Sequence, residues 1–260
     1  MVGMKMSRGY QKNFSSVHAD NVYNNEGRER KAITTLSVLK NNFSDDDVGQ
    51  MSLLDVGAST GIIDNFLSHS FAEVTGIDID TKAIDHAVKT FSSENLNFRV
   101  GDAMSLDFPE NSFDVVLCSH VYEHVPDAGQ MMDQIFRVLK PGGVCYFSAG
   151  NRLAVKEPHY NLSFLSVMPR PFAHLYLRLL GRGKYYYEKH LTYWGLKSLV
   201  SKFEIIDYTG KVINEPETFD VAYMLEPGSR KQKLARLIVE RLYWLCPGYL
   251  WLLKKPAKED

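Results

Sequence analysis

The residues best suited to binding a ligand lie in one short stretch, Leu53-Leu54-Asp55-Val56-Gly57-Ala58-Ser59-Thr60-Gly61. An apolar run ending in Asp55 is followed by a turn with two glycines and then by a helix-like segment. Glycine has no Cβ, so such a turn lets a ligand approach the backbone closely. The N–H groups at the start of a following helix favour a carboxylate or a phosphate. The stretch therefore predicts a ligand-binding strand–turn–helix unit, and a purely structural turn is the alternative.

Acidic side chains follow the next two apolar runs. Asp78 lies 23 residues after Asp55, where a carboxylate can accept hydrogen bonds from both ribose hydroxyls of a nucleoside. Asp80 is expected to cap the next helix. Asp102 and Ala103 come directly after a third apolar run, in the position expected for the edge of an adenine ring. The D-x-G-x-x-x-G spacing around Gly57 differs from the G-x-G-x-x-G of dinucleotide-binding proteins, which disfavours a nicotinamide dehydrogenase.

Two histidines in the second half of the chain are candidates for acid–base chemistry. A general base near neutral pH is most often an imidazole, and His159 and His190 both lie outside the alternating apolar runs. A structural role for each is the alternative. Two further motifs precede them: Ser119-His120-Val121-Tyr122-Glu123-His124-Val125 and Leu139-Lys140-Pro141-Gly142-Gly143.

The elements that must position these residues alternate along the chain. Apolar runs bounded by turn residues predict strands, and residues with helical periodicity predict helices between them. Strands are expected at 51–57, 73–79, 96–100, 113–118, 144–148, 203–208 and 249–253, with helices at 28–40, 59–68, 82–91, 128–139 and 229–245. Residues 41–50 are expected to form a loop, and 140–143 to end a helix. The alternation indicates an α/β fold with a parallel sheet and helices on both faces.

In order and spacing, these five motifs resemble those of the class I S-adenosylmethionine-dependent methyltransferases. The resemblance covers residues 50–150 closely and the remainder loosely. It implies a doubly wound, seven-stranded, mostly parallel sheet whose last strand is antiparallel, with S-adenosylmethionine over the carboxyl ends of strands one to four. The residues that it implies around the cofactor are Asp55, Gly57, Ala58, Ser59, Gly61, Asp78, Ile79, Asp102, Ala103, Ser119 and His120.

Within that family the chain is similar to the quinone-biosynthesis O-methyltransferases and to the methyltransferases of polysaccharide gene clusters. Residues 151–160 and 169–171 resemble the polysaccharide group. The resemblance implies methyl transfer to a small-molecule hydroxyl, with a sugar or a lipid-linked glycan precursor preferred. It implies one domain, 1–260, made of an N-terminal helical segment (1–45), a cofactor-binding core (46–150) and two substrate-side insertions (151–200 and 217–246).

The fourth motif departs from the quinone-type pattern. Some quinone-type relatives carry E-x-x-E-H there, with a divalent ion held by the acidic side chains. Here the sequence is His120-Val121-Tyr122-Glu123-His124, so the first carboxylate is missing. Hard cations prefer oxygen ligands, and only one is present. No metal is therefore expected, and Glu123 and His124 are expected to cap and anchor the next helix.

Charge is distributed unevenly along the 260 residues although the net charge is only −1, which argues against a generic polyanion binder. Residues 41–127 carry 3 basic and 16 acidic side chains, whereas residues 151–200 carry 8 basic and 2 acidic. Arg152, Arg170, Arg178, Arg182 and Lys184 lie among apolar residues, which suits an anionic, partly apolar acceptor. The basic helix expected at 230–245 could rest on a membrane or pack on the sheet. The oligomeric state stays open.

Several classes of protein are disfavoured. The N-terminus lacks the apolar core of a secretory signal, and no apolar run approaches the roughly 20 residues of a spanning helix. A cytoplasmic protein is therefore expected, and contact with the inner face of the membrane stays open. A tRNA or other nucleic-acid methyltransferase is a rival, but the chain shows no conspicuous run of basic residues. A cofactor-binding protein that only regulates a partner is the second rival, although the glycine turn and Asp78 are intact.

Overall fold

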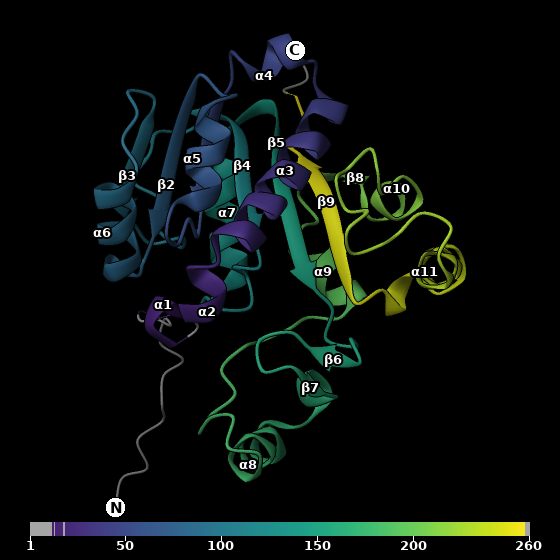
Figure 1. The fold of residues 1–260 in the computed structure, drawn as a ribbon. Helices are drawn as coiled ribbons and strands as arrows, with labels where there is room; N and C mark the ends of the chain where they lie inside the picture. The colour runs from purple at the N-terminus through teal and green to yellow at the C-terminus, as the bar shows by residue number, and fades with distance from the viewer. Residues whose placement is uncertain (1–11, 13, 18, 258–260) are drawn as a thin grey trace, which may run out of the picture.

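A seven-stranded sheet forms the centre of the structure, a computed structural model that describes residues 12, 14–17 and 19–257 (Figure 1). The strand order is β3-β2-β1-β4-β5-β9-β8. The parallel strands are β1 (Ser52–Val56), β2 (Glu73–Asp78), β3 (Leu96–Val100), β4 (Phe113–Ser119) and β5 (Leu139–Gly150). β9 (Gly248–Lys254) is antiparallel to both β5 and β8 (Glu204–Asp207). The predicted sheet, with its antiparallel last strand, is confirmed.

Both faces of the sheet are covered, which explains the continuous apolar run of β4. Successive side chains of a strand point to opposite faces. Val116 and Cys118 lie in one apolar core, whereas Val115 and Leu117 lie in the other. The first core is closed by α7 (Ala128–Val138) and α9 (Tyr193–Leu199); the second by α3 (Asn25–Asn42), α5 (Ile62–Ser68) and residues around α10 (Thr209–Asn214). α6 (Thr81–Thr90) packs beside β2 and β3.

Three local expectations were wrong. Residues 41–50 contain a short helix, α4 (Asp45–Val48), because Ser44 and Asp47 form a reciprocal capping box. The strand expected at 144–148 begins earlier: α7 ends at Val138 as the 140–143 stretch indicated, but β5 already begins at Leu139, with a register irregularity beside β4. Asp127, rather than Glu123 or His124, caps α7, since its side chain accepts a hydrogen bond from the backbone N–H of Gln130.

A small subdomain follows β5 beyond the carboxyl ends of the parallel strands (Figure 1). It consists of the hairpin β6 (Lys156–Glu157) and β7 (Leu162–Ser163), the 3-10 turn η1 (Leu165–Val167) and α8 (Arg170–Leu179). These elements share an apolar cluster of their own, made of Leu162, Leu165, Ala173, Leu177 and Tyr186. The same edge of the sheet also carries α1 (Phe14–Val17) and α2 (Ala19–Val22).

The C-terminal part contains α11 (Arg230–Arg241) and η2 (Tyr243–Leu245), which lead into β9. α11 lies beside α10 at the far edge of the sheet (Figure 1). Among the described residues, no helix is both long and apolar enough to cross a membrane.

Candidate cofactor and acceptor site

A cavity of about 460 Å³ lies where the carboxyl ends of β1, β2 and β4 meet the N-terminal helices and the subdomain after β5. Most of the residues predicted from the sequence to bind the cofactor line it: Asp55, Gly57, Ser59, Asp78, Ile79, Ala103, Ser119 and His120. The other three, Ala58, Gly61 and Asp102, are not among the lining residues. The parallel strands bring these side chains together because their carboxyl ends meet at one edge of the sheet.

The two glycines of the turn differ in what they do. Gly57 lines the cavity with φ +92°, and a Cβ there would lie 2.6 Å from Cγ2 of Val121. Gly61 precedes α5 with φ +76°, and its Cβ would lie 2.5 Å from the Phe98 ring. Both values fall in the left-handed region that favours glycine. Gly61 is therefore required by packing, whereas Gly57 also leaves the backbone open to the cavity.

Asp78 presents a carboxylate that the backbone holds in place. Its Oδ2 accepts a hydrogen bond from the N–H of Ser59 at 2.9 Å, and its Oδ1 accepts one from the N–H of Asp80 at 2.9 Å. Burial raises the pKa of this carboxyl, and the two backbone donors oppose the rise. Each carboxylate oxygen has a further lone pair for a ligand hydroxyl. Asp80 also accepts from the N–H of Lys82 and caps α6, as predicted.

Asp102 does not face the cavity as expected. Its Oδ1 accepts a hydrogen bond from the N–H of Met104 at 2.7 Å, an Asx-turn arrangement. Its neighbours Gly101 and Ala103 line the cavity instead. The third motif thus contributes a small-residue wall, and the carboxylate of Asp102 shapes the turn that carries it.

The N-terminal segment closes one side of the cavity, which the sequence motifs did not predict. Asn24, Gly27, Arg28 and Lys31 line the wall from the start of α3. Two contacts hold this segment over the carboxyl ends of the strands: the Thr60 hydroxyl donates to the Val22 carbonyl at 2.9 Å, and the Ser15 N–H donates to Asp80 at 2.8 Å. The helical periodicity of 28–40 indicated a helix but not which residues would face a ligand.

Arg28 is a half-buried cation near the acidic end of the sheet. Burial lowers the pKa of its guanidinium, and the charges of Asp55, Asp64 and Asp78 oppose that shift. Burial in turn raises the pKa of Asp55, which Arg28 opposes. The cavity therefore offers carboxylates and a guanidinium together, a combination that suits a ligand with hydroxyl groups and a carboxylate. One early signal was available: Arg28 and Lys31 directly precede the strongly acidic 41–127 segment.

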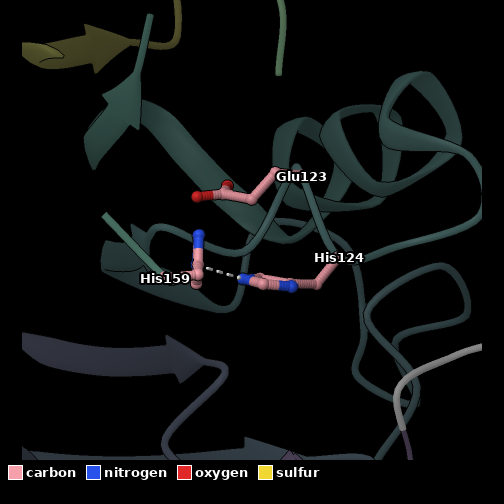
Figure 2. A group of neighbouring side chains, drawn as sticks. All are labelled: Glu123, His124 and His159. Carbon is pink, nitrogen blue, oxygen red and sulfur yellow. Dashed lines mark hydrogen bonds between the residues drawn. The ribbon is translucent and has the colours of Figure 1, made fainter. Parts of the chain in front are cut away.

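The wall of the cavity also carries a pair of imidazoles. His124 and His159 both line it, and their Nε2 atoms lie 3.1 Å apart (Figure 2). The Nδ1 of His159 donates to Oε1 of Glu157 at 2.6 Å. The Nε2 of His190 reaches the same oxygen at 3.2 Å. His190 is buried and is not among the lining residues, so it contacts Glu157 from the interior of the protein rather than from the cavity.

The two imidazoles of the pair differ in proton affinity. Burial lowers the pKa of His124 to about 4. Burial also acts to lower the pKa of His159, but Glu157 overcomes it and holds that pKa above its ordinary value. Glu157 itself is buried, which would raise its pKa, yet the hydrogen bonds from His159 and His190 hold it at about 2. A proton that reaches the pair therefore settles on His159, next to an ionised carboxylate.

Glu123 lies wholly buried behind this pair rather than at a helix terminus. Its Oε1 is 3.4 Å from Nδ1 of His120. Burial would raise its pKa, but the hydrogen bond and charge of His120 hold it at about 2. Figure 2 shows Glu123, His124 and His159 directed toward one another. Their ligand atoms lie within 4.8 Å of one another, as do those of Glu157, His159 and His190. Either group is able to hold a metal, and two imidazoles favour zinc-like ions over magnesium.

Comparison with known proteins finds related methyltransferases. The family described as "Methyltransferase domain" matches residues 54–147. A ubiquinone/menaquinone biosynthesis C-methyltransferase of Desulfotalea psychrophila is 32% identical over 142 residues, which are 52% of this chain and 53% of that protein. A ubiquinone biosynthesis O-methyltransferase of Psychrobacter cryohalolentis is 34% identical over 145 residues, 54% of this chain and 53% of that protein.

Residues 54–147 thus form a methyltransferase domain of the class I, S-adenosylmethionine-dependent type. An S-adenosylmethionine-dependent methyltransferase of Methanosarcina mazei has the same fold, with a TM-score of 0.53 and 20% identity over 85% of this chain and 98% of that one. The cofactor of this family is S-adenosylmethionine, as the motifs implied. The chain spans about half the length of the two curated relatives.

Proposed function

We propose that the protein transfers a methyl group from S-adenosylmethionine to a hydroxyl of a small molecule, with a sugar or a lipid-linked glycan precursor as the preferred acceptor. The observation that carries this proposal is the His159–Glu157 pair, whose imidazole lies on the wall of the cavity that Asp78 and Gly57 line. A hydroxyl is a weak nucleophile until its proton is removed, so a positioned imidazole beside the cofactor suits O-methylation.

The residues around the cavity fit the parts of the cofactor. Asp78 would accept the ribose hydroxyls, Gly101 and Ala103 would face the adenine, and Ser119 and His120 would lie toward the methionine part. Arg28 supplies a cation for its carboxylate. Gly57 leaves room for close approach. When bound, S-adenosylmethionine supplies a methyl group already activated by the positive sulfonium; the protein's task is to hold the acceptor oxygen in line with it.

The histidine pair receives the proton of the acceptor hydroxyl. As the acceptor oxygen forms its new bond to carbon, its proton passes to the imidazoles of His124 and His159. It remains on His159 because Glu157 stabilises the imidazolium there. His190, expected from the sequence as a second catalytic candidate, acts here as a positioning residue, because it touches Glu157 from the buried side.

Transfer to oxygen rather than to carbon can be tested directly. We expect the protein, given cofactor with a carbon-13 methyl group and a panel of sugar, lipid-linked sugar and phenolic acceptors, to form a product whose labelled carbon has the NMR shift of a methoxy group. A carbon-bound methyl signal would contradict O-methylation, and the C-methyltransferase relative makes that outcome the specific rival. Methylated tRNA without any small-molecule product would favour the nucleic-acid alternative.

Turnover should survive exhaustive treatment with EDTA. Each carboxylate already has imidazole partners, since Glu157 contacts His159 and His190 and Glu123 lies 3.4 Å from His120, so neither requires a cation as its partner. The measurement is the initial rate before and after chelation, with added magnesium and zinc as separate arms. Loss of activity that one ion restores would contradict the expectation and would make Glu123, His124 and His159 the ligand set.

Replacing Arg28 with methionine should weaken binding of S-adenosylmethionine about tenfold or more, since hydrogen bonds to charged groups contribute about 1.5–3 kcal/mol. Calorimetry with S-adenosylhomocysteine and with methylthioadenosine, which lacks the amino-acid part, separates local from global effects. Only the first ligand should bind more weakly. Arg30→Met is the matched control, because Arg30 lies on the same helix but outside the cavity lining. Equal losses for both ligands would remove the carboxylate assignment.

A further inference from the structure

Helix α8 is apolar on two sides, and only one of them is covered. Ala173 and Leu177 face the small apolar cluster of the subdomain. Phe172, Leu175 and Leu179 follow the i, i+3, i+7 spacing of a second stripe, and they are 64%, 51% and 75% exposed. The flanking Phe164 and Leu180 are 54% and 49% exposed. We name these five residues the α8 face. A contiguous exposed apolar stripe of this kind marks an interaction site.

The charges around the α8 face have one sign. Residues 167–187 carry four basic side chains and no acidic one. None of the four lines the cavity, among the residues described, so the sequence-based idea that they hold an anionic acceptor loses support. Arg170 instead donates to the carbonyl of Tyr186, and Arg178 donates to the carbonyl of Lys184. Arg182 and Lys184 are exposed next to the stripe.

Apolar side chains bordered only by cations complement an anionic bilayer. The apolar groups can enter the boundary between headgroups and acyl chains, while arginine and lysine extend to the phosphates. A protein partner would not require the uniform sign of charge. The place of α8 adds to the argument, since the same subdomain supplies Pro158 and His159 to the cavity wall. A membrane that α8 contacts would therefore lie close to the acceptor side of the site.

We propose that the α8 face docks the protein on an anionic membrane surface, so that the acceptor end of the cavity receives a lipid-linked hydroxyl from that surface. The link to the acceptor rests on the proposed function; the docking itself does not. It differs from the contact predicted for 230–245, where α11 exposes Leu234 and Leu237 at 58% and 53%. No described residue of 217–246 lines the cavity, so membrane contact through α11 would not bring a lipid-linked acceptor to the site.

Vesicle co-sedimentation tests the docking. The full chain should bind vesicles of phosphatidylcholine and phosphatidylglycerol at low salt and bind pure phosphatidylcholine weakly, because charge attraction is least screened there. Replacing Phe172, Leu175 and Leu179 with glutamine should lower binding about tenfold or more. The control, Leu234→Gln with Leu237→Gln, removes two exposed leucines of the basic helix α11 and should bind like the parent. The calorimetric affinity of both variants for S-adenosylmethionine should stay unchanged.

Three results would overturn the proposal. The first is a parent protein that ignores the anionic vesicles. The second is loss of binding in the α11 variant and not in the α8 variant, which would support the 230–245 contact. The third is a parent that self-associates in sedimentation velocity through the α8 face without binding vesicles, which would make a second copy the occupant. A protein that binds vesicles through α8 but transfers no methyl group would leave the docking in place and overturn the proposed function instead.

Discussion

Replacing His159 with glutamine should lower kcat about 100-fold or more, within the range that general bases contribute, and leave the affinity for S-adenosylmethionine within about a factor of two. The imidazole of His159 lies on the cavity wall and donates, at 2.6 Å, to the buried and ionised carboxylate of Glu157. Without it the acceptor proton has no stable destination, because burial holds the pKa of His124 at about 4. Steady-state kinetics and calorimetry on the same preparation provide both readouts.

His69→Gln is the control for this change, because His69 is exposed and outside the cavity lining. Its kcat should equal that of the parent. If His159→Gln retains most of the parent's kcat, His159 is structural, and proximity alone carries the reaction.

The pH profile gives an independent check on the same residue. The base acts only when neutral, so kcat should rise with pH. Its midpoint should lie above 6.5, the ordinary value for histidine, because Glu157 raises the pKa of His159. Glu157→Gln removes that charge, so the midpoint should move to lower pH while the plateau also falls. An unchanged midpoint in a folded variant would separate Glu157 from the titrating group.

Replacing Asp78 with alanine should weaken S-adenosylmethionine binding about 30- to 150-fold, which corresponds to about 2–3 kcal/mol. The carboxylate is already fixed by the N–H groups of Ser59 and Asp80, so it pays little ordering entropy on binding two hydroxyls. Titration calorimetry measures the change. Asp85→Ala is the control, since Asp85 is an exposed acid on α6 away from the cavity.

A second ligand shows whether the loss comes from the ribose. Adenosine should bind the parent more tightly than its 2′,3′-dideoxy analogue, and the two should bind Asp78→Ala equally. A difference that persists in the variant would assign the ribose hydroxyls to another group. If adenosine and its dideoxy analogue bind the parent equally, Asp78 does not bind the ribose hydroxyls, even if Asp78→Ala binds S-adenosylmethionine poorly.

The order of strands and the cofactor residues were predictable because their signals are local. An apolar run such as 113–118 must be buried on both faces, so it indicates a central strand wherever it occurs. Gly57 lies directly after one such strand and Asp78 lies at the end of another. The carboxyl ends of parallel strands meet at one edge of the sheet, so the two residues can be placed together without any knowledge of side-chain packing. Asp102 was misplaced because a local Asx turn competed for its carboxylate.

The acceptor side could not be predicted in the same way. Glu123 and His124 follow β4, Glu157 and His159 lie in the hairpin after β5, and His190 comes later still, so no spacing in the sequence relates them. The place of Arg28 on the cavity wall could not be predicted either, because the periodicity of 28–40 indicated a helix but not which of its faces would meet the cavity.

The sequence by itself thus indicated the alternating strands and helices, since backbone periodicity and turn chemistry act between near neighbours. The resemblance of its motifs implied the seven-stranded sheet and the residues around the cofactor. The tertiary structure alone decided which imidazoles meet and which carboxylate orients them. It also decided that one face of α8 is left in solvent. Those outcomes depend on long-range packing, in which burial selects a single arrangement from many that the chain connectivity would allow.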